Sequence, residues 1–224
     1  MSESVFRFWR RLEDLLHARL PTDRAGSEHF VLFSVASIVI LGGLFGAAMG
    51  SYGDVRPLQM FYSALKIPLL LLISFLLTIP SFYALNALCG LRGQFKESLR
   101  CILAAQVGIT ALLASLAPLS VFWYAAVPGY SAAKVFNFIL FALGAGYGWI
   151  LLKKIQHSLT THDRMHRLVT QVWILQFAFV AIQLTWILRP FIGKPGRETR
   201  FLREEAWGNA YVELTRMVLR SLGG

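Results

Sequence analysis

Five long apolar stretches divide the chain and predict helices that cross a membrane. A helix needs about 20 apolar residues to cross the roughly 30 Å hydrocarbon core of a bilayer. Stretches of about this length run over Phe30–Met49, Ile67–Cys89, Cys101–Val127, Val135–Leu152 and Leu168–Leu188. Their Leu, Ile, Phe and Ala residues do not alternate with polar ones, which favours helices over a closed barrel. The sequence therefore predicts an all-α, polytopic transmembrane helix bundle of about five spans.

Proline interrupts two of these stretches. The third stretch is too long for one straight span and too short for two, and it contains Pro118. We therefore expect a helix broken near Ala117–Pro118, with its far end tilted or interfacial. Pro80 lies in the second stretch, removes a backbone donor and frees the carbonyl of Leu76, so a kink is expected there.

Amphipathic helices are predicted at both ends of the chain. Between Met1 and Leu20, apolar residues recur at helical spacing while Arg7, Arg10 and Arg11 occupy other faces. This segment either lies in an anionic membrane interface or packs on the protein's own loops. The tail carries a second apolar stripe with charges of both signs, which favours packing against the bundle or a partner. The expected organisation is an amphipathic cytoplasmic segment (1–29), a transmembrane domain (30–190) and an amphipathic tail (191–224).

Composition and charge agree with a membrane protein. Of 224 residues, 56% are hydrophobic and 15% charged, against about 25% charged in a typical soluble domain. This excludes a disordered chain and a disulfide scaffold and disfavours a soluble enzyme. The net charge of +10 does not indicate nucleic-acid binding, because the basic residues follow the predicted membrane boundaries.

The same basic residues predict the topology. Twelve Lys and Arg precede the first span or lie in the second and fourth loops, against three in the first and third loops, one of them Lys66. Because positive charge favours the cytoplasmic side, the N-terminus is expected in the cytoplasm of a bacterial inner (plasma) membrane. Five spans then place the basic tail on the opposite side, a conflict that a re-entrant third stretch would remove.

Small residues at four-residue spacing predict close helix packing inside the membrane. Such stripes let backbones approach, and they serve either packing within the chain or homo-oligomerisation. The residues concerned are Gly42, Gly46 and Gly50 in the first span, Ala104 and Gly108 in the third, and Gly144 and Gly148 in the fourth.

Two further sets of residues are candidates for function. Five amides are predicted at membrane depth: Asn86, Gln106, Asn137, Gln176 and Gln183. Each needs a hydrogen-bond partner or water, so they indicate either helix–helix contacts or a polar translocation path. No charged residue is expected near the middle of a span, which disfavours ion-coupled transport. Contacts with lipid headgroups are predicted for Arg7, Trp9, Arg10, Arg11, Arg92, Lys96, Trp186 and Arg189.

Little in the sequence points to chemistry. His162 and His166 stand four apart beside His157, but no HExxH motif or further ligand accompanies them. Cys89 and Cys101 fit no metal pattern and are interpreted as packing residues. No nucleophile–base pair, Walker A or dinucleotide motif is present, so we expect no cofactor, no metal and no enzymatic activity.

The order of these features resembles that of the Yip1-like family of five-span membrane proteins. The likeness covers roughly Ser51 to Arg189: a proline-bearing second span (ALKIPLLLLISFLLTIPSFYALNALCG), a short basic loop (LRGQFKESLR) and a third span ending in APLSVFWY. The resemblance implies a role in membrane organisation. We therefore expect a non-enzymatic membrane scaffold or accessory subunit whose partners are the lipid bilayer and a membrane protein or second copy. The alternative is a small-solute channel or transporter lined by Gln and Asn.

Overall fold

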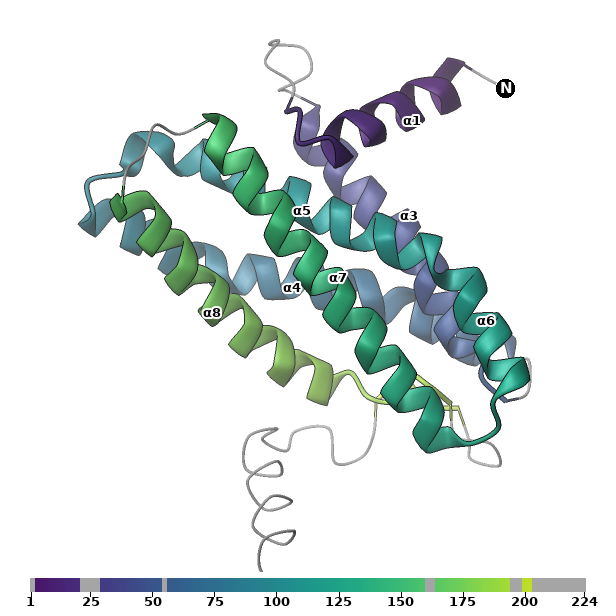
Figure 1. Cartoon of the computed structure of the whole chain (residues 1–224). Helices are drawn as coiled ribbons and strands as arrows, with labels where there is room; N and C mark the ends of the chain where they lie inside the picture. Colours follow the sequence, from purple (N-terminus) through teal and green to yellow (C-terminus); the bar gives the residue numbers. More distant parts are fainter. Residues whose placement is uncertain (1–2, 21–28, 54–55, 160–163, 194–198, 203–224) are drawn as a thin grey trace, which may run out of the picture.

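The computed structural model describes residues 3–20, 29–53, 56–159, 164–193 and 199–202. The elements of these residues are helices (Figure 1): α1 (Glu3–Leu16), α3 (Phe30–Gly50), α4 (Pro57–Leu88), the 3-10 helix η1 (Arg92–Gln94), α5 (Phe95–Ser115), α6 (Ala117–Ala126), α7 (Tyr130–Leu159) and α8 (Arg164–Ile187). Five segments are long and apolar enough to cross a membrane. The predicted all-α bundle of five spans is therefore confirmed.

The third span is broken where proline predicted. α5 ends at Ser115 and α6 begins at Ala117, with Pro118 in its first turn. Two contacts show where this span ends: the ring of Tyr52, just after α3, lies 5.3 Å from the ring of Tyr124 in α6 and 6.0 Å from that of Tyr130 in α7. The third span thus runs from one end of the bundle to the other and is not re-entrant.

The second span begins ten residues earlier than its apolar stretch. α4 starts at Pro57 and continues through Pro68 and Pro80 to Leu88. Lys66 was expected in the first loop as a topology determinant, but it lies inside α4 and its side chain is fully buried. The expectation failed because helix and hydropathy boundaries differ: Gln59 and Ser63 extend the helix without adding to the apolar run. Gly42, well inside α3, contacts the neighbouring Ile67, so Lys66 lies at the depth of the spans.

α3 is the central helix of the bundle. It packs against both α4 and α5, while α7 packs on α5 and α8 packs on α4. Figure 1 shows α1 at the upper end of the molecule, beside the start of α3, whereas α8 ends at the opposite end. The tail therefore leaves the bundle on the side opposite α1. The predicted amphipathic helix of the tail lies outside the described residues.

Candidate functional site

One candidate site is the end of the bundle on which α1 lies. Leu12 and Leu15 of α1 are buried, and the ring of Phe8 lies 5.4 Å from that of Phe33 in α3. The guanidinium of Arg11 lies 6.0 Å from the same Phe33 ring. One side of α1 is thus fixed on the bundle by apolar burial, against helices and not against the loops that the second interpretation of the sequence expected.

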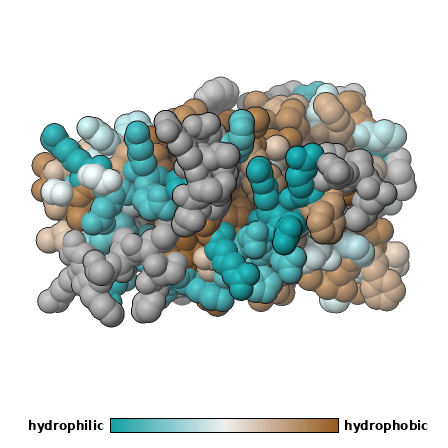
Figure 2. All heavy atoms as spheres, turned by 90° about the horizontal axis from the view of Figure 1, so that it is seen from above, coloured by the Kyte–Doolittle hydropathy of each residue, from teal (hydrophilic) through white to brown (hydrophobic). Residues whose placement is uncertain are grey.

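α1 keeps a second apolar edge that the bundle does not cover. Val5, Phe6 and Trp9 are 40%, 58% and 55% exposed. Arg7, Arg10 and Arg11 are exposed on the same helix. Seen from above, the surface shows hydrophilic residues across its middle and hydrophobic ones beyond them (Figure 2). An apolar edge beside cations is the arrangement that suits a helix at a lipid interface.

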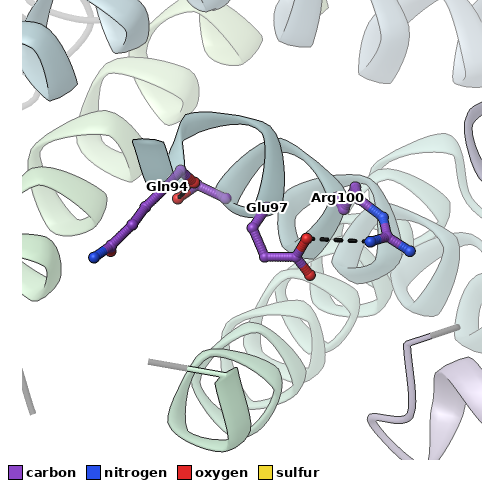
Figure 3. A network of polar contacts seen from close by, with 4 residues as sticks. Gln94, Glu97 and Arg100 are labelled. Atoms are coloured by element: carbon purple, nitrogen blue, oxygen red, sulfur yellow. Dashed lines mark hydrogen bonds and ion pairs between the residues drawn. The ribbon is translucent and has the colours of Figure 1, made fainter. Parts of the chain in front are cut away.

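The second loop adds basic groups near this end of the bundle. Arg92 and Lys96 are exposed. Arg100 pairs with Glu97, with Nη1 3.1 Å from the carboxylate (Figure 3), and its guanidinium lies 5.1 Å from the ring of Phe30. A partly exposed pair within one helix contributes about 0–1 kcal/mol to stability. The Phe30 contact brings the loop to the start of α3.

The glycine stripe of α3 packs on α4. A Cβ added at Gly46 would clash with the carbonyl oxygen of Ser63, and one at Gly50 would lie 2.7 Å from Cα of Met60. At Gly42 an added Cβ would meet both Ile67 and Thr110 at ordinary contact distance, about where α3 passes between α4 and α5. The stripe therefore serves packing within the chain.

The other small residues join α5 to α7. An added Cβ at Gly108 would clash with the Leu151 side chain, and one at Gly148 would lie 2.5 Å from Ile109. A Cβ added at Gly144 would lie 3.4 Å from the Ile109 side chain, and Ala104 is fully buried. These stripes too are used inside one chain, so they are not the surfaces through which copies could associate.

Two of the five amides have partners for their nitrogens, whereas the buried oxygen of each is unpaired among the described residues. Asn86 is fully buried and its Nδ2 donates to the carbonyl of Phe82 at 2.8 Å. Asn137 donates from Nδ2 to the hydroxyl of Tyr124 in α6 at 2.6 Å and to the carbonyl of Ala133 at 2.7 Å. Both amide nitrogens therefore serve helix packing.

Gln106 differs because both the nitrogen and the oxygen of its buried amide lack a partner in the described chain. It is 2% exposed, and within the described chain neither its Nε2 nor its Oε1 has a hydrogen-bond partner. The hydroxyls of Ser34, Ser37 and Ser74 are equally buried and equally unpaired among these residues. Buried polar groups without protein partners normally bind water.

These four side chains lie in one layer of the bundle. Gly42 sets the register, because it faces Ile67 of α4 and Thr110 of α5. Counting from these contacts at 1.5 Å per residue, all four polar residues lie roughly 6 to 12 Å from Gly42 toward the α1 end. We call Ser34, Ser37, Ser74 and Gln106 the inner polar layer. The sequence analysis singled out only Gln106, since single serines in apolar helices carry little signal.

Gln106 lies at a different depth from Asn137, and the other two amides lie on another helix. Gln106 lies near the level of Leu151, because Gly108 contacts Leu151. Asn137 is 14 residues from Leu151 along α7, or roughly 21 Å. Gln176 and Gln183 lie on α8, which packs on α4, and both are half-buried. The four amides are therefore spread over α5, α7 and α8 and lie at different depths.

At the opposite end, α4 holds the segment that follows α8. Lys66 donates from Nζ to the carbonyl of Pro190 at 2.6 Å, and Ser63 donates to the carbonyl of Phe191 at 2.5 Å. Gln59 adds a donor to Phe191 at 3.3 Å. We call this the α4 clasp: Gln59, Ser63 and Lys66 holding the carbonyls of residues 190 and 191.

The surroundings of Lys66 are aromatic. Its ammonium lies 5.9 Å from the ring of Phe191 and 5.1 Å from that of Phe201. Such rings attract a desolvated cation. The sequence analysis missed the clasp, although one signal was present: Gln59, Ser63 and Lys66 are spaced by four and three and share one helix face.

The predicted anchor at the end of α8 is formed by Arg189 and Trp186. The Arg189 guanidinium lies over the Trp186 ring, 3.1 Å from its centre, and Nε donates to the Trp186 carbonyl at 3.3 Å. A stacked Arg and Trp at a helix end suits the membrane–water interface.

The histidines and cysteines assemble no site among the described residues. His162 lies outside them, while His166 is buried in the first turn of α8. Cys101 is buried and Cys89 half-buried, and both are free thiols. In the part of the chain that the structure describes, no three His, Cys, Asp or Glu residues gather as metal ligands.

The fold and these sites define the chain as a polytopic helical membrane protein. Comparison with family models, with curated proteins and with solved structures found no match. The geometry of the chain itself must therefore support any functional assignment.

Proposed function

We propose that the protein is a non-enzymatic membrane scaffold or accessory subunit that holds anionic lipid at one end of its bundle through α1. The observation that carries this proposal is the divided apolar face of α1: Leu12 and Leu15 are buried on the bundle, while Val5 and Trp9 stay exposed beside arginines. A helix that served only packing would need no second apolar edge.

The energetics favour a lipid contact for this edge. An apolar side chain transferred from water gains roughly 25 cal/mol per Å² of buried surface, and basic residues near an anionic leaflet contribute about 1 kcal/mol each. Arg92 and Lys96 on the second loop add to the same charge. The likeness to the Yip1-like family, and a location in a bacterial inner membrane with this end in the cytoplasm, remain predictions that agree with such a role.

The proposal is tested by the depth of α1 in lipid vesicles. Nitroxide labels are attached at Val5→Cys, Trp9→Cys and, as the control on the polar face of α1, Asp14→Cys, each in a Cys89→Ser, Cys101→Ala background. In vesicles of phosphatidylcholine with phosphatidylglycerol, labels at 5 and 9 should collide with oxygen more than with a water-soluble nickel complex. The label at 14 should show the reverse.

Vesicles of phosphatidylcholine alone supply the second control. There the labels at 5 and 9 should lie less deeply, because the arginines have no anionic surface to bind. Equal exposure of all three labels to the nickel complex in both vesicles would reject lipid binding by α1.

A second candidate function rests on the inner polar layer. Gln106 and three serines with unpaired buried polar atoms would stabilise water or a small polar solute inside the bundle. This arrangement favours the channel or transporter alternative, with a lining different from the one that the sequence suggested. Flux of small uncharged solutes into proteoliposomes would test it: Gln106→Leu should lower the flux, and flux no greater than in empty vesicles would reject it.

A further inference from the structure

α8 presents a regular apolar stripe that is largely exposed. In its most apolar 18-residue segment only 17% is buried, against 33–50% in the matching segments of the other four spans. Five residues of the stripe are 45–74% exposed: Leu168, Val172, Leu175, Phe179 and Ile182. Their spacing of four, three, four and three is the 3.5-residue repeat of the seam between two coiled helices. Lipid contact alone requires no such repeat.

Two glutamines border this stripe on opposite edges. Gln171 precedes Val172 and is exposed, and Gln176 follows Leu175 and is half-buried. Within the described residues, neither amide has a hydrogen-bond partner. In heptad terms they occupy the g and e positions, which flank the seam and contact the partner helix.

Lipid can cover the stripe but cannot satisfy these amides. Gln176 is at the centre of α8 (Arg164–Ile187), far from either headgroup region. It also lies about 120° around the helix from Thr170, whose hydroxyl accepts from Gln156 of α7 at 3.1 Å, so it does not face α7. An amide without a partner in hydrocarbon costs several kcal/mol. The covering surface must therefore supply a donor and an acceptor at mid-bilayer depth.

We propose that α8 is the interface between two copies of this chain, paired along the stripe. Copies inserted in the same orientation have parallel α8 helices. In a parallel pair, a g residue lies beside the e residue five positions later on the other helix. That spacing places Gln171 against the partner's Gln176, and the two-fold axis repeats the contact.

A second copy fits this surface better than an unrelated partner. An amide is both donor and acceptor, so two glutamines satisfy each other. The glycine stripes that otherwise bring membrane helices together are already used inside the chain, by α3 with α4 and by α5 with α7. α8 is the span left with both an apolar seam and unpaired amides.

Cysteine cross-linking in native membranes tests the geometry. Leu175→Cys and Ile182→Cys are introduced separately into a Cys89→Ser, Cys101→Ala background and oxidised. Each should give a covalent dimer of twice the chain mass. Leu143→Cys is the matched control, because Leu143 is 54% exposed near the middle of α7. It should stay monomeric under the same oxidation.

The glutamine contact is tested by measuring how readily the dimer dissociates in lipid. Energy transfer between labelled copies monitors the dissociation. Gln171→Leu and Gln176→Leu should each weaken pairing by on the order of tenfold, because each removes both symmetric contacts. Since the two side chains pair with each other, the double variant should lose little more than either single variant.

The inference would be overturned by monomers at all protein-to-lipid ratios, by cross-linking at position 143 as efficient as at 175, or by an adduct with a protein of different mass in place of the dimer. Unchanged pairing in Gln176→Leu would show that the two amides do not hold the copies together, and it would overturn the inference too. Loss of pairing while α1 keeps its lipid contact would leave the proposed function standing.

Discussion

Lys66 Nζ donates to the carbonyl of Pro190 at 2.6 Å and joins residues 124 positions apart. The bond ties the start of α4 to the chain that follows α8. It accounts for a fully buried lysine in an apolar helix, because the carbonyl and two phenylalanine rings replace water around the ammonium.

Lys66→Met should loosen the segment after α8. The substitution preserves most of the side-chain volume but leaves the Pro190 carbonyl without its lysine donor, which costs about 1–3 kcal/mol. A cysteine at Ile192, which is 6% exposed, should then react with a thiol reagent at least about fivefold faster. Lys134→Met, at an exposed lysine, is the control and should change nothing. Equal reaction rates in both variants would contradict the clasp.

Gly46→Ala should destabilise the bundle, whereas Gly146→Ala should not. The added methyl at Gly46 meets the backbone of Ser63 and Ala64, which cannot move aside cheaply. At Gly146 an added Cβ meets nothing within 4 Å. Overpacking of this kind costs about 1–3 kcal/mol, and the exposed control should stay within about 0.5 kcal/mol. Thermal unfolding in detergent measures the stability of both variants. Equal unfolding midpoints for Gly46→Ala and Gly146→Ala would show that α3 and α4 separate more easily than their packing indicates.

Leu15→Ala should release α1 from the bundle without unfolding the spans. Leu15 is 2% exposed, and truncating a buried leucine costs about 2–5 kcal/mol. Hydrogen exchange of the α1 amides should rise sharply while that of α3 stays constant. Val5→Ala is the matched control, since Val5 is 40% exposed, and it should leave α1 exchange unchanged in detergent. Unaltered exchange in Leu15→Ala would mean that α1 is not held by apolar burial.

Tyr124→Phe should weaken the contact between α6 and α7 modestly. It removes the hydroxyl that accepts from Asn137 at 2.6 Å, but the bond from Asn137 to the Ala133 carbonyl remains. Hydrogen bonds between membrane helices contribute about 0.6 kcal/mol, so the unfolding midpoint should fall slightly. Tyr83→Phe, at a 50% exposed tyrosine, should have no effect. A loss above about 2 kcal/mol would indicate that this hydroxyl does more than accept one bond.

Local sequence predicted the elements well, because a chain in lipid must satisfy its backbone within each segment. The five apolar stretches, the break beside Pro118 and the amphipathic pattern of α1 are properties of neighbouring residues. The element boundaries were less predictable. α4 extends back to Pro57 through Gln59 and Ser63 because those polar residues bind a distant segment.

The candidate sites depended more on contacts between distant residues. The sequence named Gln106 and Asn137 together. In the described chain Gln106 has no hydrogen-bond partner, whereas Asn137 donates to Tyr124 and Ala133, because α5 and α7 place the two amides at different depths. Gly46 and Gly148 were recognised as packing residues, but which helix each one meets follows from how the spans are arranged around α3.

By itself, the sequence determined that this is a bundle of about five membrane helices with a basic amphipathic N-terminal segment. That much follows from segment length, apolar content and helical periodicity, all of which act over a few turns. Only the tertiary structure decided that Lys66 is buried, that the glycine stripes are used inside the chain and that α8 keeps an uncovered seam. These depend on which surfaces meet, and a side chain finds its partner only when another helix brings a donor, an acceptor or an apolar face to the same depth.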